Sequence, residues 1–502
     1  MKKKLFAAID VGSYELSMKI YEIASGKEWK QIDYIRHRID LGTESYSKGI
    51  LSYERMEELC HVLREFKQIM DTYKVDDYKA YGTSAIRELH NTIIILDQIK
   101  NLTGLHIDVL SNSEQRFLDY KSVASAGDEF ETIIAKGSAI LDIGGGSIQL
   151  SLFDKDTLVT TQNIRIGVFR LNEQLRKIGA KPSHTEALLE EMIQEELAVF
   201  KKLYLKDRKI VNLIVVDDYV SPYLSKQKES DLGTRGYLSK NTYNSLLSGG
   251  FFKEMESPVI ASSQLVKCTM EVMDIDYLWI PGVTLCDGIA YDYAVNNKLI
   301  RPEHDFEQDI VACAKNISNR YQGSKKRGEA LEKMALAVFD ATKKLHGLGK
   351  RERMYLGIAA LLQDCGRYVS LTQLGDCSYN IVMNTEIIGL SHAEREVVAN
   401  IVRFNHEKFR YYEEMAATST IDRKDFIIIA KLTAILRLAC ALDSSHKQKC
   451  TNVKIHFEEA ELIISVDTDQ NIELEKGLFD EHAKLFEEVF TVHPILKQKK
   501  SF

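Results

Sequence analysis

The sequence predicts an α/β fold of two similar lobes, followed by an all-helical domain and a small α+β piece. Two apolar runs end in the same way, the first at Asp10-Val11-Gly12-Ser13 and the second at Asp142-Ile143-Gly144-Gly145. Another apolar run follows each of them, so both patterns predict strand, tight turn and strand. Mixed strands and helices in two similar halves indicate two lobes with a ligand between them.

The first lobe is expected at residues 1–125 and the second at 126–300, because a chain of 502 residues is too long for one core. In the first lobe, an amphipathic helix follows Ser52, a second helix runs from about Ser84 to Lys100, and a third begins near Ser113. The strands expected there are residues 5–9, 16–23, 29–39, 78–82 and 106–110.

The second lobe repeats this order less regularly. A long helix is expected to begin at Ser183-His184-Thr185-Glu186, which has the spacing of a capping box. The strands expected there are residues 138–142, 148–153, 158–166, 210–216 and 276–280.

Only helical patterns occur in the domain expected at residues 301–450. They cover residues 306–320, 326–345, 352–363, 390–404 and 425–442. The α+β piece is expected at 451–502, with a hairpin of strands 453–457 and 462–466 and a helix at 478–490. The basic tail with Lys497, Lys499 and Lys500 is expected to be solvated.

Composition excludes several classes of protein. A net charge of −7 argues against general nucleic-acid binding, and no apolar run is long enough to span a membrane. The eight cysteines form no CxxC pair, which favours reduced thiols in a cytoplasmic protein. The lysines at residues 2–4 lead into a strand without a cleavage site, so we expect no export signal.

The two glycine turns are the first candidates for chemistry. Glycines let backbone N–H groups approach a ligand closely, and Asp142 at a strand end is placed to hold a hydrated cation. A hairpin without a ligand would explain either turn alone. Two such turns facing each other across a cleft would clamp a polyphosphate from both sides.

Two further clusters lie where a strand meets a helix. In Gly82-Thr83-Ser84-Ala85-Ile86-Arg87, helix N-terminal amides and a bidentate arginine are suited to an anion, although a cap with a surface arginine fits equally well. Ser111-Asn112-Ser113-Glu114 repeats this context. A glutamate there usually stabilises the helix dipole, but it follows a strand of the same sheet and is placed to face the same cleft.

These motifs resemble the exopolyphosphatase/guanosine pentaphosphate phosphatase (Ppx/GppA) family of the actin and sugar-kinase superfamily. The matching pieces are Ile9-Asp10-Val11-Gly12-Ser13; Leu41-Gly42 with Gly49-Ile50-Leu51; Gly82 to Arg87 with Asn91; Leu110-Ser111 with Glu114; Leu141 to Ser147; and Gly167 with Arg170-Leu171. A weaker match is Leu285-Cys286-Asp287-Gly288-Ile289. The resemblance implies a two-lobed, actin-like (ribonuclease H-like, duplicated) fold.

The resemblance also implies a metal-assisted hydrolase that removes terminal phosphates. Glu114 would position and deprotonate the attacking water, and Arg87 would brace the phosphate. Asp142 and Asp10 would hold Mg²⁺, or Mn²⁺ in its place. The cradle for the reacting phosphate would be Gly12, Ser13, Thr83, Gly144, Gly145, Gly146 and Ser147. Positioning and charge neutralisation supply most of the acceleration in phosphoryl transfer.

Several positions depart from the family pattern. Gln149 stands where a second metal-binding carboxylate is usual, and an amide binds Mg²⁺ more weakly than a carboxylate. Gln115 follows Glu114 in place of a second acid, and Asn112 replaces a glycine. The other departures are Tyr14-Glu15, and Asp217-Asp218-Tyr219, which weakens any nucleotide-base site.

The helical domain resembles an HD-type domain that has lost its metal ligands. Gln363, before Asp364, replaces the histidine of the His-Asp pair, and Cys377 and Gln322 stand where further ligands are usual. His392, His406 and His446 remain at spacings that fit no ligand set. The basic segments Lys325-Lys326-Arg327 and Arg403-Lys408-Arg410 are candidates for guiding polyphosphate or are simply solvated faces.

The sequence therefore predicts a cytoplasmic, Mg²⁺-dependent exopolyphosphatase that acts on linear inorganic polyphosphate and, by resemblance, forms a homodimer. A guanosine pentaphosphate (pppGpp) phosphatase is the alternative within the same enzyme class. A catalytically weakened polyphosphate or nucleotide binder with a regulatory role is favoured by Gln149 and Asp217-Asp218. A sugar or acetate kinase fits less well, because the glycines on the adenosine side are absent.

Overall fold

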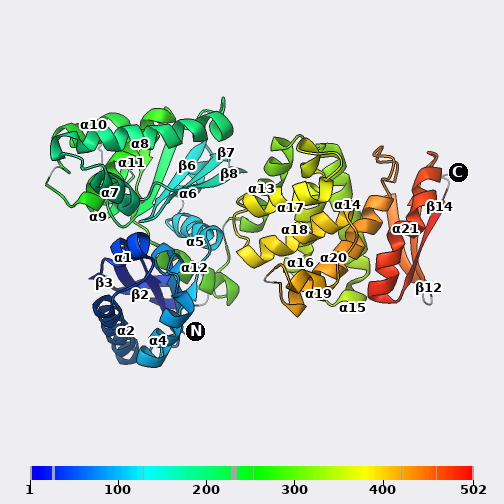
Figure 1. The fold of residues 1–502 in the computed structure, drawn as a ribbon, viewed down its shortest axis with the longest axis horizontal. Coiled ribbons are helices and arrows are strands. Elements are labelled where there is room, and N and C mark those ends of the chain that lie inside the picture. The colour runs from blue at the N-terminus through cyan, green and yellow to red at the C-terminus, as the bar shows by residue number, and fades with distance from the viewer. Residues whose placement is uncertain are drawn as a thin grey trace. The chain divides into compact units, whose positions relative to one another are not determined.

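The computed structural model divides into two compact units, residues 1–306 and 307–502 (Figure 1). It describes residues 3–24, 29–127, 129–155, 157–227, 234–252, 254–302, 304–419, 421–450, 452–458 and 461–499. Across these ranges we find no helix with the length and apolar character needed to cross a membrane.

The first lobe of unit 1 is built on a five-stranded sheet in the order β3-β2-β1-β4-β5. β2 pairs antiparallel with β1 and β3, whereas β4 is parallel to β1 and β5. The strands are β1 (Lys3–Val11), β2 (Glu15–Ala24), β3 (Trp29–Arg38), β4 (Asp77–Gly82) and β5 (Asp108–Val109).

Helices cover both faces of this sheet (Figure 1). Ile9 and Val11 of β1 pack on the side of α2 and α4, whereas Phe6 and Ala8 pack against α5 and α12. This alternation is the period of a strand buried on both faces. The helices are α1 (Leu41–Lys48), α2 (Tyr53–Tyr73), α3 (Ser84–Arg87), α4 (Thr92–Thr103), α5 (Asn112–Ala124) and α12 (Leu285–Asn296).

The second lobe repeats this topology in the order β10-β11-β9-β6-β7-β8. β6, β7 and β8 are antiparallel neighbours, and β9 lies parallel to β6, as β4 does to β1. The strands are β6 (Ser138–Ile143), β7 (Ile148–Asp154), β8 (Thr157–Ile164), β9 (Asn212–Asp217), β10 (Tyr237–Ser239) and β11 (Tyr277–Trp279). The duplication predicted from the two turns is therefore present in the sheets.

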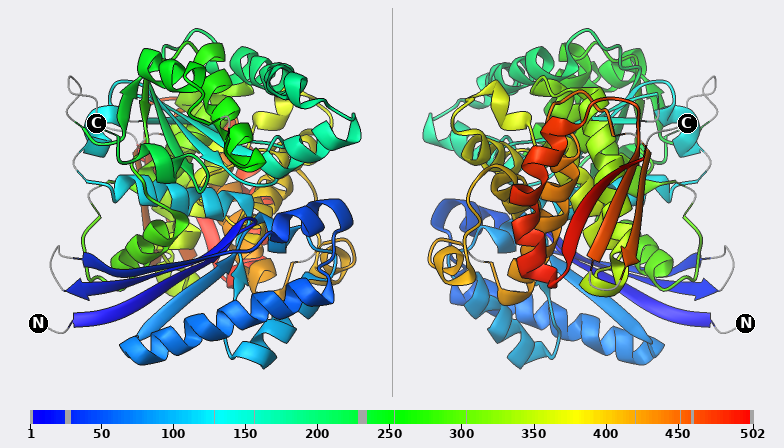
Figure 2. Two further views of the ribbon diagram at one scale, coloured as in Figure 1. Left: turned by 90° about the vertical axis from the view of Figure 1, so that its left-hand side faces the viewer. Right: turned by 90° about the vertical axis from the view of Figure 1, so that its right-hand side faces the viewer.

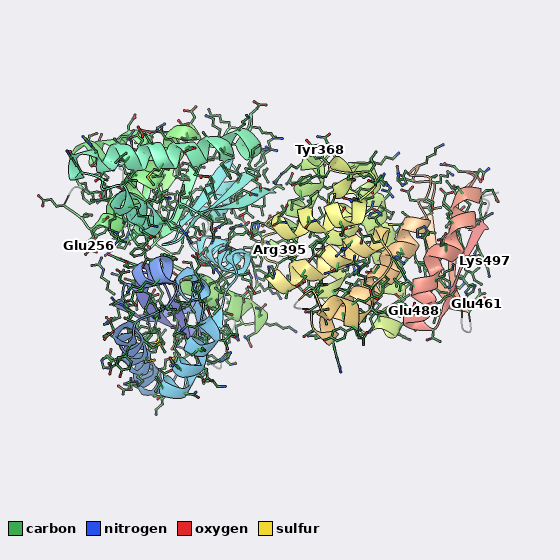
Figure 3. The ribbon with its side chains drawn as sticks, in the orientation of Figure 1. Glu256, Tyr368, Arg395, Glu461, Glu488 and Lys497 are labelled. Atoms are coloured by element: carbon green, nitrogen blue, oxygen red, sulfur yellow. The ribbon has the colours of Figure 1, made fainter. Side chains whose placement is uncertain are left out.

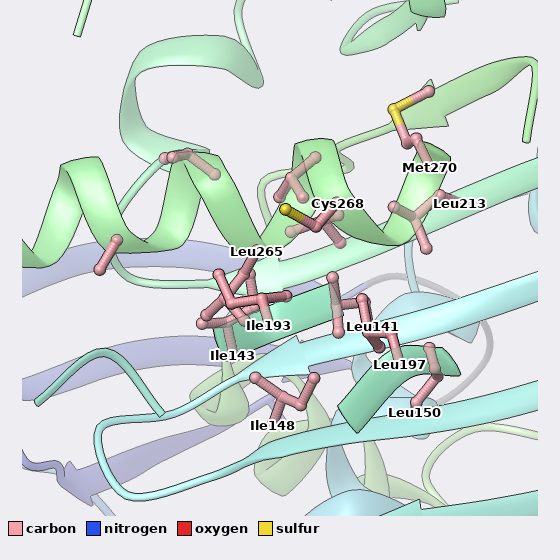
Figure 4. Packing of buried hydrophobic residues seen from close by; sticks show 14 of the residues in the cluster. Leu141, Ile143, Ile148, Leu150, Ile193, Leu197, Leu213, Leu265, Cys268 and Met270 are labelled. Atoms are coloured by element: carbon pink, nitrogen blue, oxygen red, sulfur yellow. The ribbon is translucent and has the colours of Figure 1, made fainter. Parts of the chain in front are cut away.

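The core of the second lobe lies between this sheet and two long helices. Figure 4 shows Leu141 of β6 and Leu150 of β7 packed with Leu197 of α8 and Leu265 of α11. The remaining elements of the lobe are α6 (Glu129–Ile134), α7 (Val168–Lys177), η1 (Pro182–His184), α8 (Thr185–Phe200), η2 (Lys201–Leu205), α9 (Ser221–Leu224), α10 (Lys240–Ser248) and α11 (Ser257–Val272).

Unit 2 begins with a helical part in which α14, α16, α18 and α20 pack against one another. A three-stranded sheet follows, in which β13 pairs antiparallel with β12 and parallel with β14, and α21 lies beside it (Figure 2). The elements are α13 (Phe306–Arg320), α14 (Lys325–Ala341), α15 (Lys343–His346), α16 (Lys350–Leu362), η3 (Cys365–Tyr368), α17 (Leu374–Asn384), α18 (His392–His406), α19 (Tyr412–Ala416), α20 (Arg423–Ala441), β12 (Asn452–Glu458), β13 (Glu461–Asp467), α21 (Glu473–Phe490) and β14 (His493–Lys499).

Two predictions of local structure are wrong. The helix expected from Ser84 to Lys100 is interrupted after Arg87, where the His90 N–H donates to the Gly49 carbonyl at 2.8 Å. The spacing from Ser183 to Glu186 forms no capping box, because a 3₁₀ turn occupies residues 182–184 and α8 has no side-chain cap.

Lys497 and Lys499 of the basic tail are exposed, as predicted, although the tail forms a strand. Lys497 and Lys499 belong to β14, which pairs with β13, while Lys500 lies outside the described residues. The helices α10 and α11 were missed as well.

Candidate functional site

The two glycine turns have the same internal hydrogen bond. The Gly12 N–H donates to the Glu15 carbonyl at 3.1 Å, and the Gly144 N–H donates to the Ser147 carbonyl at 3.0 Å. These two amides close their turns and are not available to a ligand. The next N–H in each turn, that of Ser13 or Gly145, makes no hydrogen bond to any described residue.

The turns lie directly against each other across the two lobes. A Cβ placed on Gly145 would come within 2.8 Å of the Ser13 Cβ and 2.7 Å of the Phe169 ring. On the other side, the Phe169 N–H at the start of α7 donates to the Gly145 carbonyl at 3.0 Å. The absence of a side chain at Gly145 is thus what allows the two lobes to meet here.

One small cavity, of about 50 Å³, lies where the turns meet. Asp10 and Asp142 end β1 and β6, the central strands of the two sheets, and both line it. Its lining comprises Asp10, Gly12, Ser13, Tyr14, Thr83, Ser84, Gln115, Asp119, Asp142, Ile143, Gly144, Gly145, Val216, Asp217, Asp218, Tyr219, Thr284 and Leu285.

Carboxyl groups crowd this cavity, and burial together with like charges raises the pKa values of Asp10, Asp142 and Asp218. Burial raises the pKa of Asp142 to about 7 and, with the charge of Asp217, that of Asp218 to about 6. The pKa of Asp10 is raised well above its ordinary value by burial and by the charges of Asp218, Glu15 and Asp142. Like charges in a site of low polarity oppose ionisation, so a cation would be bound favourably.

Asp217 differs from the other acids because its carboxylate is already satisfied. Its two oxygens accept hydrogen bonds from the backbone N–H groups of Val220 and Ser221 and from the Ser262 hydroxyl, at 2.6 to 3.0 Å. The carboxylate of Asp217 therefore holds the loop after β9 in place and does not serve to bind a ligand.

Three hydroxyl groups close one side of the cavity. The Tyr46 hydroxyl lies 2.6 Å from the Ser13 Oγ and 2.7 Å from the Ser84 Oγ, and these two oxygens are 3.1 Å apart. Hydroxyl groups reorient readily, so this cluster can turn its O–H groups toward an anion.

Two predicted residues lie away from the cavity. Oε2 of Glu114 accepts hydrogen bonds from the N–H and the hydroxyl of Ser111, at 3.0 and 2.6 Å, which completes a capping box on α5. Arg87 donates to the Leu110 carbonyl and to Oδ1 of Asn112, at 2.6 and 2.5 Å. Both side chains therefore secure the start of α5.

Gly146, Ser147 and Gln149 also lie outside the lining. The Gly146 carbonyl accepts a hydrogen bond from Nε of Arg170 at 2.7 Å, and the Ser147 carbonyl closes the turn. Gln149 is buried, and its Oε1 accepts a hydrogen bond from Nε of Arg116 at 2.6 Å. The position where a second carboxylate was expected is therefore occupied by an amide that faces an arginine.

A larger cavity, of about 350 Å³, adjoins the first and shares Tyr14, Asp218 and Tyr219 with it. Its lining also includes Arg36 and Arg38 of β3. At this edge Glu256, labelled in Figure 3, joins the lobes, because it accepts hydrogen bonds from the Tyr14 hydroxyl at 2.7 Å and from Arg38 at 2.5 Å.

The helical part of unit 2 contains a buried cluster of charges at the expected HD-type position. Arg327, predicted to lie on a solvated face, is instead buried and bridges Asp364 and Asp443, with Nε 3.1 Å from Oδ2 of Asp443. His406 lies beside it, with Nε2 2.6 Å from the Gln363 carbonyl oxygen, and burial lowers the pKa of His406 to about 4. The arginine supplies the positive charge between these carboxylates.

Sequence reasoning missed Asp119 and Tyr46, and it placed Ser84 in a candidate cluster without giving its hydroxyl a role. Asp119 follows Gln115 by four residues on α5, so both lie on the helix face that lines the cavity. The i, i+4 spacing of Gln115 and Asp119 was the available signal, but the other polar residues of α5 hid it.

The donor set is suited to a hard divalent cation. No three carboxylate, histidine or cysteine side chains among the described residues are grouped as a ready metal site. Mg²⁺, however, commonly takes only one or two carboxylates and completes its shell with water and phosphate oxygens. Oδ1 of Asp10 and Oδ2 of Asp119 are buried without a hydrogen-bond partner in the described structure, which leaves oxygen atoms available.

Comparisons with known proteins match both units. The model of the Ppx/GppA phosphatase family matches residues 19–230, and that of Ppx/GppA phosphatase, domain III, matches residues 311–488. A guanosine-5'-triphosphate,3'-diphosphate pyrophosphatase of Photobacterium profundum is 20% identical over 449 residues, 86% of each chain. One of Vibrio vulnificus is 20% identical over 482 residues, 92% of each chain.

A solved structure shares the fold. The chain resembles the crystal structure of an exopolyphosphatase from Cytophaga hutchinsonii with a TM-score of 0.50 and 19% identity, over 58% of this chain and 98% of that one. The paired lobes with their facing turns thus form an actin-like α/β fold. Together the two family models span more than half of the sequence, and the first of them covers the second glycine turn at residues 142–147. The chain therefore belongs to the Ppx/GppA phosphatase family.

Proposed function

We propose that this chain is an exopolyphosphatase that hydrolyses terminal phosphates of linear inorganic polyphosphate with a divalent cation, Mg²⁺ or Mn²⁺. One observation carries the proposal. The turns Gly12-Ser13 and Gly144-Gly145, from opposite lobes, line a single cavity together with Asp10 and Asp142. A terminal phosphate held there would contact both lobes at once.

The chain's own groups have distinct parts in this proposal. The N–H groups of Ser13 and Gly145 donate to phosphoryl oxygens, and the hydroxyls of Ser13 and Ser84 add donors on one side. Asp142 would hold the cation, with Asp10 facing the same cavity from the first lobe. When bound, the cation would neutralise charge on the phosphoryl oxygens. Closure of the lobes excludes bulk water, which strengthens each of these interactions.

The roles that the resemblance gives to Glu114 and Arg87 remain predictions. For Glu114 to orient water in the cavity, its hydrogen bonds to Ser111 would have to break, at a cost of about 1 kcal/mol for a lost cap. Arg87 would likewise have to leave Leu110 and Asn112. We expect single substitutions at these residues to act partly through the position of α5.

The test is release of orthophosphate from purified full-length protein with Mg²⁺. Long-chain polyphosphate, short-chain polyphosphate and guanosine pentaphosphate are compared at equal concentrations of terminal phosphate. We expect the wild type to release orthophosphate from polyphosphate and the Asp142→Asn variant to release none. No release from any polyphosphate, at any tested concentration of Mg²⁺ or Mn²⁺, would refute the proposal.

Hydrolysis of guanosine pentaphosphate is the second candidate. Two observations favour it: the name carried by the relatives from Photobacterium and Vibrio, and the adjoining cavity with its tyrosines and two arginines. Arginine and aromatic groups together suit a nucleotide. Preferential release from the nucleotide, reduced in Arg36→Ala, would select this candidate.

A weakened polyphosphate or nucleotide binder is the third candidate, favoured by Gln149. Restoration of phosphate release by Gln149→Glu in an otherwise inactive protein would select it. Because Oε1 of Gln149 faces Arg116, the new carboxylate would pair with that arginine first. We therefore expect Gln149→Glu to leave activity unchanged.

For unit 2 we propose a degenerate HD-like domain that serves as a scaffold or as a guide for polyphosphate. Arg327 in place of a bound metal supports this proposal, and it predicts no metal-dependent phosphohydrolase activity from this domain. We further propose a cytoplasmic location and a homodimer. Light scattering of the purified chain tests the dimer.

A further inference from the structure

Glu114 and Asp119 both lie on α5, but only Asp119 lines the cavity between the lobes. The carboxylate of Glu114 is held by Ser111 in the capping box. The side chain of Asp119 starts five residues later and is only 3% exposed. A helix advances about 100° per residue, so these two side chains point in clearly different directions.

The buried oxygens of the cavity indicate a missing partner. Oδ2 of Asp119 and Oδ1 of Asp10 accept no hydrogen bond from the described part of the chain, and Asp10 is 8% exposed. A buried polar atom without a partner is costly, and such atoms in native proteins call for a ligand, an ion or water. Both atoms belong to residues that line the same cavity.

Asp119 lines the same cavity as Asp142, and burial together with the charge of Asp142 raises the pKa of Asp119. Asp142 comes from the end of β6 in the second lobe, whereas Asp119 comes from the helix that follows the first lobe's sheet. Two carboxyl groups that line one small cavity are placed to bind one cation together. Gln115, one turn before Asp119, adds an amide oxygen that accepts no hydrogen bond in the described structure.

We propose that Asp119 and Asp142 form the carboxylate pair that binds the divalent cation, and that Glu114 is not part of this site. Two carboxylates meet the usual protein contribution to an Mg²⁺ site, with water and phosphate oxygens as the other ligands. Asp119 thereby supplies a second carboxylate in place of the one that is usual at the position of Gln149 in the family. This inference rests on the proposed function only where phosphate oxygens are named as ligands. The two carboxylates are proposed to bind the cation whether or not phosphate is present.

The experiment measures Mn²⁺ binding to the full-length protein without substrate, by electron paramagnetic resonance of free Mn²⁺. Asp119→Asn and Asp119→Ala are compared with Glu114→Gln and with Glu129→Gln, an exposed acid on α6. We expect both Asp119 variants to weaken Mn²⁺ affinity by at least about tenfold, the loss that even supporting residues of a metal site produce. Glu114→Gln and Glu129→Gln are expected to leave the affinity unchanged.

Thermal unfolding in EDTA separates a binding role from a structural one. Asp119→Asn should unfold at the same temperature as the wild type or higher, because it removes an acid from a crowded buried site. In saturating Mn²⁺ the wild type should gain more stability than this variant. Wild-type Mn²⁺ affinity in both Asp119 variants, equal losses in Glu114→Gln, or no Mn²⁺ binding by the wild type would each overturn the inference.

The proposed function fails independently of this result. Mn²⁺ binding that depends on Asp119, in a protein that releases no phosphate, would leave the cation site intact and remove the exopolyphosphatase proposal. Phosphate release by a protein whose Mn²⁺ affinity is the same in the wild type and the Asp119 variants would support the exopolyphosphatase proposal and remove the proposed cation site.

Discussion

Gly145→Ala should separate the two lobes at the cavity. The new Cβ would lie 2.7 Å from the Phe169 ring and 2.8 Å from the Ser13 Cβ, whereas ordinary contact begins at 3.4 Å. The neighbours would therefore have to give way by about 0.7 Å, the difference between 3.4 and 2.7 Å. Extra methyl groups in packed interiors cost about 1–3 kcal/mol.

The displacement falls on the groups that would hold the phosphate. Ser13 and Gly145 provide the proposed N–H donors, and a misplacement of about 1 Å in a catalytic constellation costs about 100-fold in rate. We expect kcat/KM for phosphate release to fall by about two orders of magnitude, with a loss of about 1–3 kcal/mol in the free energy of unfolding by urea.

Gly477→Ala is the matched control, because its Cβ would meet no atom within 4 Å on the helix α21. Alanine is the better helix former by about 1 kcal/mol, so this variant should be at least as stable as the wild type and equally active. Wild-type activity and stability in Gly145→Ala would refute the reasoning.

Two further predictions concern buried charges. Arg327→Met removes the arginine partner of Asp443 and leaves Asp364 with Arg367 alone, and it should cost about 3–5 kcal/mol in unfolding free energy, whereas Arg353→Met, at an exposed ion pair with Asp340, should cost less than about 1 kcal/mol. Equal losses in these two variants would contradict the first prediction. For Asp218, the pKa is raised from 3.8 to about 6 in the folded protein, so its ionisation lowers stability as pH rises through that window. The stability of Asp218→Asn relative to the wild type should therefore increase between about pH 4 and pH 7 in metal-free urea titrations, and a constant difference would contradict this sign.

The turns could be predicted because their signal is local. A strand that ends in aspartate and continues through glycine and serine specifies both the turn and the polar atom at the strand end. The same pattern at Asp10 and Asp142 was enough to place these residues at the centres of two equivalent sheets. Hydrophobic periodicity predicted most of the strands of the two sheets, but it missed helices such as α10 and α11.

The role of α5 could not be predicted as well, because the face that it presents to the cavity depends on tertiary packing. The spacing from Ser111 to Glu114 is that of a capping box, and the structure uses it as one. The same spacing from Ser183 to Glu186 forms no cap. Local spacing therefore suggests a cap without deciding it. Likewise, no local pattern reveals that Arg327 meets Asp443, which lies 116 positions away in the chain.

The small volume of the cavity has a consequence for how a long substrate is handled. About 50 Å³ is far below the roughly 300 Å³ of even a small ligand pocket. On one edge Arg170 of α7 pairs with Glu88, and on the other Glu256 holds Tyr14 and Arg38. We expect the admission of a phosphate terminus to loosen these links between the lobes, in which case turnover should slow as solvent viscosity increases.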